Sequence, residues 1–152
     1  MFSSGMKFEY ARYRTSDGPD ITRPIIRVLM HNPRDVHATS IACEALVDSG
    51  ADFCVFSGEI ADLLGIDITA GQQQLVSGVV AGESRPVYFH AIEIIVGPYG
   101  HALRLPIWAG FMPDLANNGH GLLGRHGFFS GLTFVKFRDH DAELELGKRQ
   151  RR

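Results

Sequence analysis

The sequence has few of the features that mark a secreted, membrane-spanning or nucleic-acid-binding protein. Its 152 residues include only two cysteines, and we expect Cys43 and Cys54, which lie in apolar runs, to be reduced and buried. No apolar run approaches the roughly 20 residues that cross a bilayer, and the N-terminus lacks the charged-then-apolar order of a secretory signal. The net charge of -2 gives no electrostatic reason to bind nucleic acid. We therefore expect a cytoplasmic protein that binds neither membranes nor nucleic acid.

What the sequence does contain is typical of one soluble domain. Hydrophobic residues make up 45% of the chain and charged residues 21%, which is the balance of a globular protein with a real core. We expect an N-terminal extension with a possible strand over residues 1–19, a folded domain over residues 20–147, and a basic, solvated tail over residues 148–152.

Most segments are short. Some alternate apolar and polar residues with period two, and others are apolar runs rich in residues that favour strands. The expected strands cover about residues 7–13, 23–30, 39–48, 72–78, 85–97, 102–108, 132–137 and 142–146. One short helix is predicted in "SGEIADLLG", with Ser57 as the N-cap and Gly65 as the stop, and its apolar face is expected to carry Ile60, Leu63 and Leu64. A second helical turn is possible in "GRHGFFSG". The pattern predicts an all-β domain, built as a small closed barrel or a sandwich with a long mid-chain hairpin.

An aspartate lies between two apolar segments in "ALVDSGADFCVF". A carboxylate in that place is costly to bury unless backbone N–H groups hold it. Asp48 ends a predicted strand, and Ser49 and Gly50 form a tight turn that can supply those groups. Taken alone, the tripeptide favours a strand-ending Asx-turn over a catalytic loop.

A second segment changes that balance. "ALVDSGAD" has two apolar residues, Asp, Ser, Gly and Ala, and the later "GLLGRHGFF" has Leu122, Leu123 and Gly124 followed by Arg125. In this order, with a glycine-tipped hairpin between them, the two segments resemble those of the retropepsin-like (retroviral-type) aspartic proteases. The resemblance covers roughly residues 20–147 and is closest to small bacterial single-domain members, which share the early "RPII" and the late "GLLG" and "GFF" sequences. It implies a small closed barrel of the retropepsin (acid protease) type with one short helix and a flap hairpin.

The resemblance also implies roles for the residues of the first segment. It assigns catalysis to Asp48, with Ser49 reaching across to a partner loop and Gly50 completing the turn. Gly50 and Ala51 would line the floor along which the substrate backbone runs. Asp52 would contact substrate and form an ion pair with Arg125, the alternative being that both are ordinary surface residues.

Two further segments receive roles by the same resemblance. The hairpin around "SGVVAGES" would be a flap that closes over substrate, with Gly78 and Gly82 supplying flexibility and Val79 and Val80 apolar contact. The alternative for this hairpin is a plain surface ribbon. The segment of Leu122, Leu123, Gly124 and Arg125 would support the catalytic loop.

Hydrolysis by aspartates needs two carboxylates that share one proton. The chain has one Asp-Ser-Gly, so an aspartic endopeptidase would need a second Asp48 from a second copy, and we expect a homodimer that cleaves peptide or protein substrates. The alternative is a non-catalytic retropepsin-fold module that binds peptides or dimerises.

The remaining motifs point to no metal or cofactor. Seven histidines are scattered over the chain, with His120 and His126 flanking the glycine-rich segment, but there is no HExxH or CxxC pattern. "GHGLLGRHG" lacks the Gly-Lys-Ser/Thr ending of a phosphate-binding loop. Trp108 and the phenylalanines at 111, 128, 129, 134 and 137 are most simply core or dimer contacts.

Overall fold

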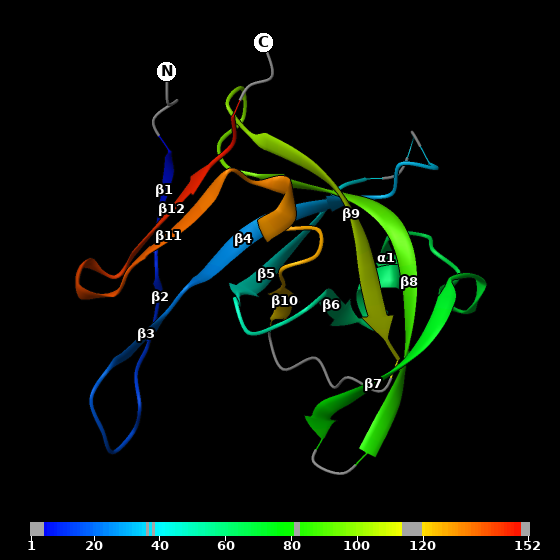
Figure 1. Ribbon diagram of the computed structural model, residues 1–152, viewed down its shortest axis with the longest axis horizontal. Coiled ribbons are helices and arrows are strands. Elements are labelled where there is room, and N and C mark those ends of the chain that lie inside the picture. The colour runs from blue at the N-terminus through cyan, green and yellow to red at the C-terminus, as the bar shows by residue number, and fades with distance from the viewer. Residues whose placement is uncertain (1–4, 36, 38, 81–82, 114–119, 150–152) are drawn as a thin grey trace.

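In a computed structural model of the chain, the described residues are 5–35, 37, 39–80, 83–113 and 120–149. Strands predominate among them, as Figure 1 shows. In chain order the strands are β1 (Met6–Glu9), β2 (Ala11–Tyr13), β3 (Ile21–Arg23), β4 (Ile25–His31), β5 (Ile41–Val47), β6 (Cys54–Ser57), β7 (Gln72–Val80), β8 (Glu83–Val96), β9 (Leu103–Met112), β10 (Gly121–Leu123), β11 (Phe134–Arg138) and β12 (Glu143–Gly147). The helical elements are α1 (Gly58–Leu63) and the 3-10 turns η1 (Ile68–Ala70), η2 (Phe129–Gly131) and η3 (Asp139–Asp141).

Six of the described strands close into a barrel. They follow one another in the order β4-β5-β10-β6-β9-β8, and β8 pairs back with β4, where Met30 lies opposite Ile94. β10 runs parallel to β5 and β9 runs parallel to β6, whereas the other neighbours are antiparallel. β7 extends the sheet beyond β8. The predicted all-β closed barrel with one short helix is confirmed, and the sandwich is not the architecture.

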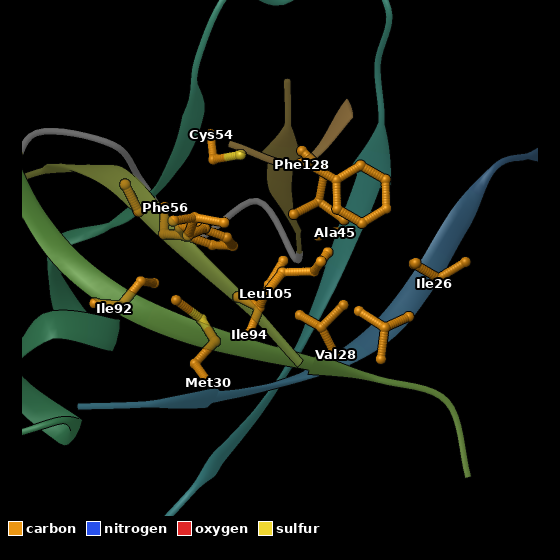
Figure 2. Close-up of a cluster of buried hydrophobic side chains, with 14 of the residues drawn as sticks. Ile26, Val28, Met30, Ala45, Cys54, Phe56, Ile92, Ile94, Leu105 and Phe128 are labelled. Carbon is orange, nitrogen blue, oxygen red and sulfur yellow. The ribbon is translucent and has the colours of Figure 1, made fainter. Parts of the chain in front are cut away.

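The barrel is filled by side chains from alternate positions of its strands. Figure 2 shows Val28 and Met30 of β4, Ile92 and Ile94 of β8, and Leu105 of β9 pointing into this interior. Burying each such side chain contributes roughly 1.5–3 kcal/mol. The intervening positions of β8 face the other way and form a second, smaller cluster outside the barrel. That cluster consists of Val55, Val87, Phe89 and Met112, with Phe53 and Val76 packed against it.

The helix forms where the sequence predicts it, but two of its details differ. Ser57 precedes α1, yet its side chain makes no capping hydrogen bond. Because Ser57 also ends β6, its hydroxyl stays in the interior, where it has no partner among the described residues. Leu64 is buried, whereas Leu63 is 63% exposed, so the expectation that both lie on the packed face is wrong. Gly65 follows with φ +70° and ends the helix. No helix in the described ranges is long and apolar enough to cross a membrane.

Two smaller sheets lie outside the barrel. β1 pairs with β12, which pairs with β11, and β2 pairs with β3 as a separate ribbon. The single strand expected over residues 7–13 is therefore wrong, because the chain changes pairing partner at Tyr10. The Tyr10 N–H donates to the carbonyl of Ala142 (2.8 Å), and its side chain is buried. In β12, Leu144 and Leu146 are buried, as their alternation with glutamates predicts.

Candidate active site

Asp48 stands directly after β5, in a turn that holds its carboxylate. The Asp48 N–H donates to the carbonyl of Leu123 (3.0 Å), which ties the residue to β10. The Gly50 N–H donates to Oδ1 of Asp48 (2.8 Å), and the Ala51 N–H donates to its carbonyl (3.2 Å). Asp48 is half-buried while Ser49 and Gly50 are exposed. The predicted turn is present, and it leaves one carboxylate oxygen fixed by the backbone at the surface of the barrel.

β10 lies beside this turn, so the structure brings the two sequence segments together. Leu123 pairs with Val47 in the parallel ladder, and Leu122 pairs with Val55 of β6. β10 thus lies between the strand that enters the Asp48 turn and the strand that leaves it. The resemblance implied a supporting role for this segment, and that role stays a prediction.

Gly124 continues that contact into the loop. A Cβ on Gly124 would overlap the carbonyl oxygen of Phe53, and would lie 2.6 Å from the Phe53 carbonyl carbon and 2.8 Å from the Ala51 oxygen. No side chain fits between these backbones. Glycine is therefore required because the segment after β10 and the loop after Asp48 touch directly.

The ion pair expected between Asp52 and Arg125 does not form. Both residues are described and both are exposed, and the ion pairs of the described residues, formed within 4.0 Å, do not include them. The backbone joins these segments instead, with the Arg125 N–H donating to Ala51 (2.9 Å) and the His126 N–H to Asp52 (2.8 Å). Two exposed charged side chains gain little free energy from pairing in water. The two backbone hydrogen bonds therefore hold the loop without an ion pair between Asp52 and Arg125.

An aromatic group lies next to the loop. The Phe53 ring stacks on His126 (centroids 5.5 Å) and meets the Phe89 ring edge-on (5.3 Å). Phe89 stacks in turn with Trp108 (6.4 Å), whose side chain is 45% exposed. The sequence did not mark Phe53 and Phe89 as neighbours, since their contact joins segments that are far apart in the chain.

Asp48 and Ser49 line one end of a hollow of about 640 Å³. The other lining residues are Tyr10, Thr22, Pro24, Leu46, Val47, Phe137 and Asp139. The Tyr10 hydroxyl donates to Oδ1 of Asp139 (2.7 Å). Burial, together with this hydrogen bond and the charge of Asp139, raises the pKa of Tyr10 well above its ordinary value. Tyr10 and Asp139 received no site role from the sequence, because no local pattern places them beside Asp48.

The expected flap is the hairpin of β7 and β8, which pair from Gln72 opposite Phe89 to Val80 opposite Glu83. Gly78, Val79 and Val80 belong to β7, while the tip at residues 81–82 lies outside the described residues. The register shifts between Ser77 and Val80. The flap role of this hairpin stays a prediction.

The described residues offer no metal site, since no three His, Cys, Asp or Glu side chains among them are grouped to hold an ion.

No family model matches the sequence, and no curated protein matches it either. Among solved structures, the chain is similar to the crystal structure of a retropepsin-like aspartic protease from Rickettsia conorii, with a TM-score of 0.56 and 19% sequence identity over 97% of this chain and 96% of that one. The EIAV protease complexed with the inhibitor HBY-793 matches with a TM-score of 0.37 and 19% identity, over 68% of this chain and 82% of that one. The first likeness shows that this chain has the retropepsin-like fold.

Proposed function

We propose that the protein is an aspartic endopeptidase that acts as a homodimer. The observation that carries this proposal is the Asp48 turn, in which the Gly50 N–H holds one carboxylate oxygen at 2.8 Å while the residue lines an open hollow. Such a carboxylate is oriented, partly desolvated and accessible to substrate. The likeness in fold to a solved retropepsin-like aspartic protease also supports the proposal.

The reaction needs a second carboxylate. Two carboxyl groups a few ångströms apart cannot both ionise, as is known of the aspartic-protease dyad. The ionised member takes a proton from water as the water attacks the peptide carbonyl, and the protonated member polarises that carbonyl. The pair then protonates the leaving amine, so neither a covalent intermediate nor a metal takes part.

A second copy of Asp48 is the best source of that carboxylate. The other carboxylate lining the same hollow belongs to Asp139, which is exposed and accepts the Tyr10 hydroxyl at 2.7 Å. Asp139 is not held by a glycine turn, and its hydrogen bond serves to anchor Tyr10. A two-fold axis beside Asp48 would instead supply an identical, equally oriented group.

The surrounding residues receive roles within this proposal. Ser49, exposed next to Asp48, would contact the partner's loop, and Ala51 and Asp52 would lie along the substrate backbone. In the β7–β8 hairpin, Gly78, Val79 and Val80 would close over the substrate and exclude water. The segment Leu122–Arg125 would keep the catalytic loop in place through the backbone contacts described above.

The test is digestion of a peptide library at mildly acidic pH by the purified full chain, with and without a pepstatin-type inhibitor. Asp48→Asn should lower the rate by about 10²–10⁴-fold, the usual contribution of a positioned acid or base. Asp62→Asn, which changes an exposed carboxylate of α1 that does not line the hollow, is the matched control and should retain activity. Cleavage that survives Asp48→Asn would come from another enzyme and contradict the proposal, and a wild type without cleavage would favour the non-catalytic peptide-binding or dimerisation module.

A further inference from the structure

The ribbon of β2 and β3 is unusual in how little of it is buried. Its two strands pair with each other and, among the described strands, with no other. Of its six residues only Ala11 is half-buried, and the rest are exposed. Figure 1 shows the ribbon projecting from the barrel beside the end of the β11–β12 hairpin. An isolated two-stranded ribbon is marginally stable in water, so this one gains stability from any surface that covers it.

The two faces of the ribbon differ in chemistry. Tyr13 lies opposite Ile21 in the ladder, and Arg12 lies opposite Thr22. Directly opposed residues share a face, so Tyr13 and Ile21 form an apolar pair, 38% and 41% exposed respectively. Thr22, on the other face, lines the hollow beside Asp48. The apolar pair therefore points away from the hollow of its own protomer and is available to a second molecule.

The hollow offers a surface that complements this pair. Phe137 lines it with a side chain that is 38% exposed, next to apolar Pro24 and Leu46. Its charged lining residues are both acidic, Asp48 and Asp139. On the face of the apolar pair, the charged residue of the ribbon strands is Arg23, whose guanidinium lies 5.9 Å from the centre of the Tyr13 ring, whereas Arg12 lies opposite Thr22 on the other face. An apolar pair beside the basic Arg23 matches an apolar floor beside carboxylates.

We propose that the β2–β3 ribbon is a dimerisation arm, whose Tyr13–Ile21 face packs against Phe137 beside the hollow of a second copy of this chain. This inference rests on the proposed function, because a shared dyad requires the hollow that Asp48 lines to face its own copy. The ribbon borders that same hollow through Thr22, and Pro24 directly after it also lines the hollow, so the ribbon lies at the edge where the copies would meet. Under two-fold symmetry each arm packs against the other protomer, and the two contacts are identical.

The first experiment measures the dimer dissociation constant of the full chain by sedimentation. The double variant Tyr13→Ser/Ile21→Ser should weaken the dimer at least about tenfold, as expected for central apolar contacts. Its matched control is Leu63→Ser/Tyr99→Ser, which removes exposed apolar side chains that do not line the hollow, and it should leave the constant unchanged. Equal dimer affinity of the arm variant and the wild type would overturn the arm.

The second experiment locates the contact. Tyr13 is replaced by the photoreactive residue p-benzoylphenylalanine in an unlabelled chain, which is mixed with wild-type chain labelled with 15N. The expected crosslink joins position 13 to a labelled peptide that contains Phe137. Crosslinks only within one chain, only to other labelled segments, or only to an added peptide substrate would each contradict the arm.

The two proposals fail in different ways. If the arm variant keeps both dimer affinity and peptidase activity, the arm is wrong and the peptidase stands. If the wild type stays monomeric and inactive at every concentration, both are wrong. If the arm variant loses activity only at concentrations where its dimer dissociates, both are supported.

Discussion

Gly124 and Phe53 meet backbone to backbone, and the carbonyl of Phe53 occupies the space that a side chain on Gly124 would need. A methyl group there must displace the loop that follows Asp48. We expect Gly124→Ala to destabilise the fold by about 1–3 kcal/mol, the usual cost of overpacking, and to abolish the proposed activity. Urea denaturation measures the first effect, and peptide digestion measures the second.

The control for that substitution is Gly131→Ala. A Cβ at Gly131 would meet Leu105 at 3.4 Å, which is ordinary van der Waals contact, so this variant should fold with nearly wild-type stability. If Gly124→Ala proves as stable as Gly131→Ala, the close approach of the two backbones is not the constraint that we describe.

The proposed dyad of two Asp48 carboxylates makes a prediction about mixtures. Asp48→Asn chains should join wild-type chains in dimers that carry only one intact carboxylate and do not turn over. In an equimolar mixture with free exchange, about one quarter of the dimers are then fully wild type. The activity should fall to about one quarter of that of an equal total amount of wild type. A fall to about one half, in proportion to the wild-type chain present, would show that each protomer works alone.

The two thiols should differ in reactivity. Cys54 is buried inside the barrel and Cys43 is half-buried, so the expectation that both are buried holds only for Cys54. Burial is the largest effect on each thiol and raises both pKa values, which lowers the fraction present as reactive thiolate. We expect iodoacetamide to label Cys43 slowly in the folded protein, and Cys54 only after unfolding. Mass spectrometry of the labelled peptides distinguishes them, and rapid labelling of Cys54 under native conditions would contradict a closed barrel.

Local patterns in this sequence predicted strands whose buried and exposed residues alternate. The alternation of Leu144 and Leu146 with glutamates indicated β12, and both leucines are buried. The resemblance to the retropepsin-like proteases, and not a local pattern, implied that the segment ending at Gly124 lies against the Asp48 turn, and Leu123 pairs with Val47 in the structure. The alternation in β12 is a constraint on neighbouring residues, which is why it can be read from the sequence alone.

The predictions that failed depended on contacts between distant segments. Tyr10 interrupts the expected first strand because its backbone and hydroxyl bind Ala142 and Asp139, more than 120 residues away. Asp52 and Arg125 are close in space, yet the ladder between their backbones leaves both side chains exposed. No periodicity within either segment carries that information, since it depends on how the barrel closes.

Tyr10 supplies a prediction about pH. Burial is the main cause of its raised pKa, with smaller contributions from Asp139. Because the pKa is higher in the folded than in the unfolded state, the stability linked to it is fully present below the unfolded value of about 10 and falls as pH rises above that value. Tyr10→Phe removes the ionisable hydroxyl and its hydrogen bond, which should cost about 1 kcal/mol at neutral pH.

The measurement is the free energy of unfolding of wild type and Tyr10→Phe between pH 7 and 11. Comparing the two cancels the titration of the other tyrosines and the lysines, so the difference reports Tyr10 alone. The wild type should be the more stable at pH 7, and its advantage should shrink above about pH 10, where the unfolded chain releases the Tyr10 proton and the folded chain retains it. A constant advantage across this range would show that folding does not shift the Tyr10 pKa, and an advantage that grows with pH would reverse the sign of that shift.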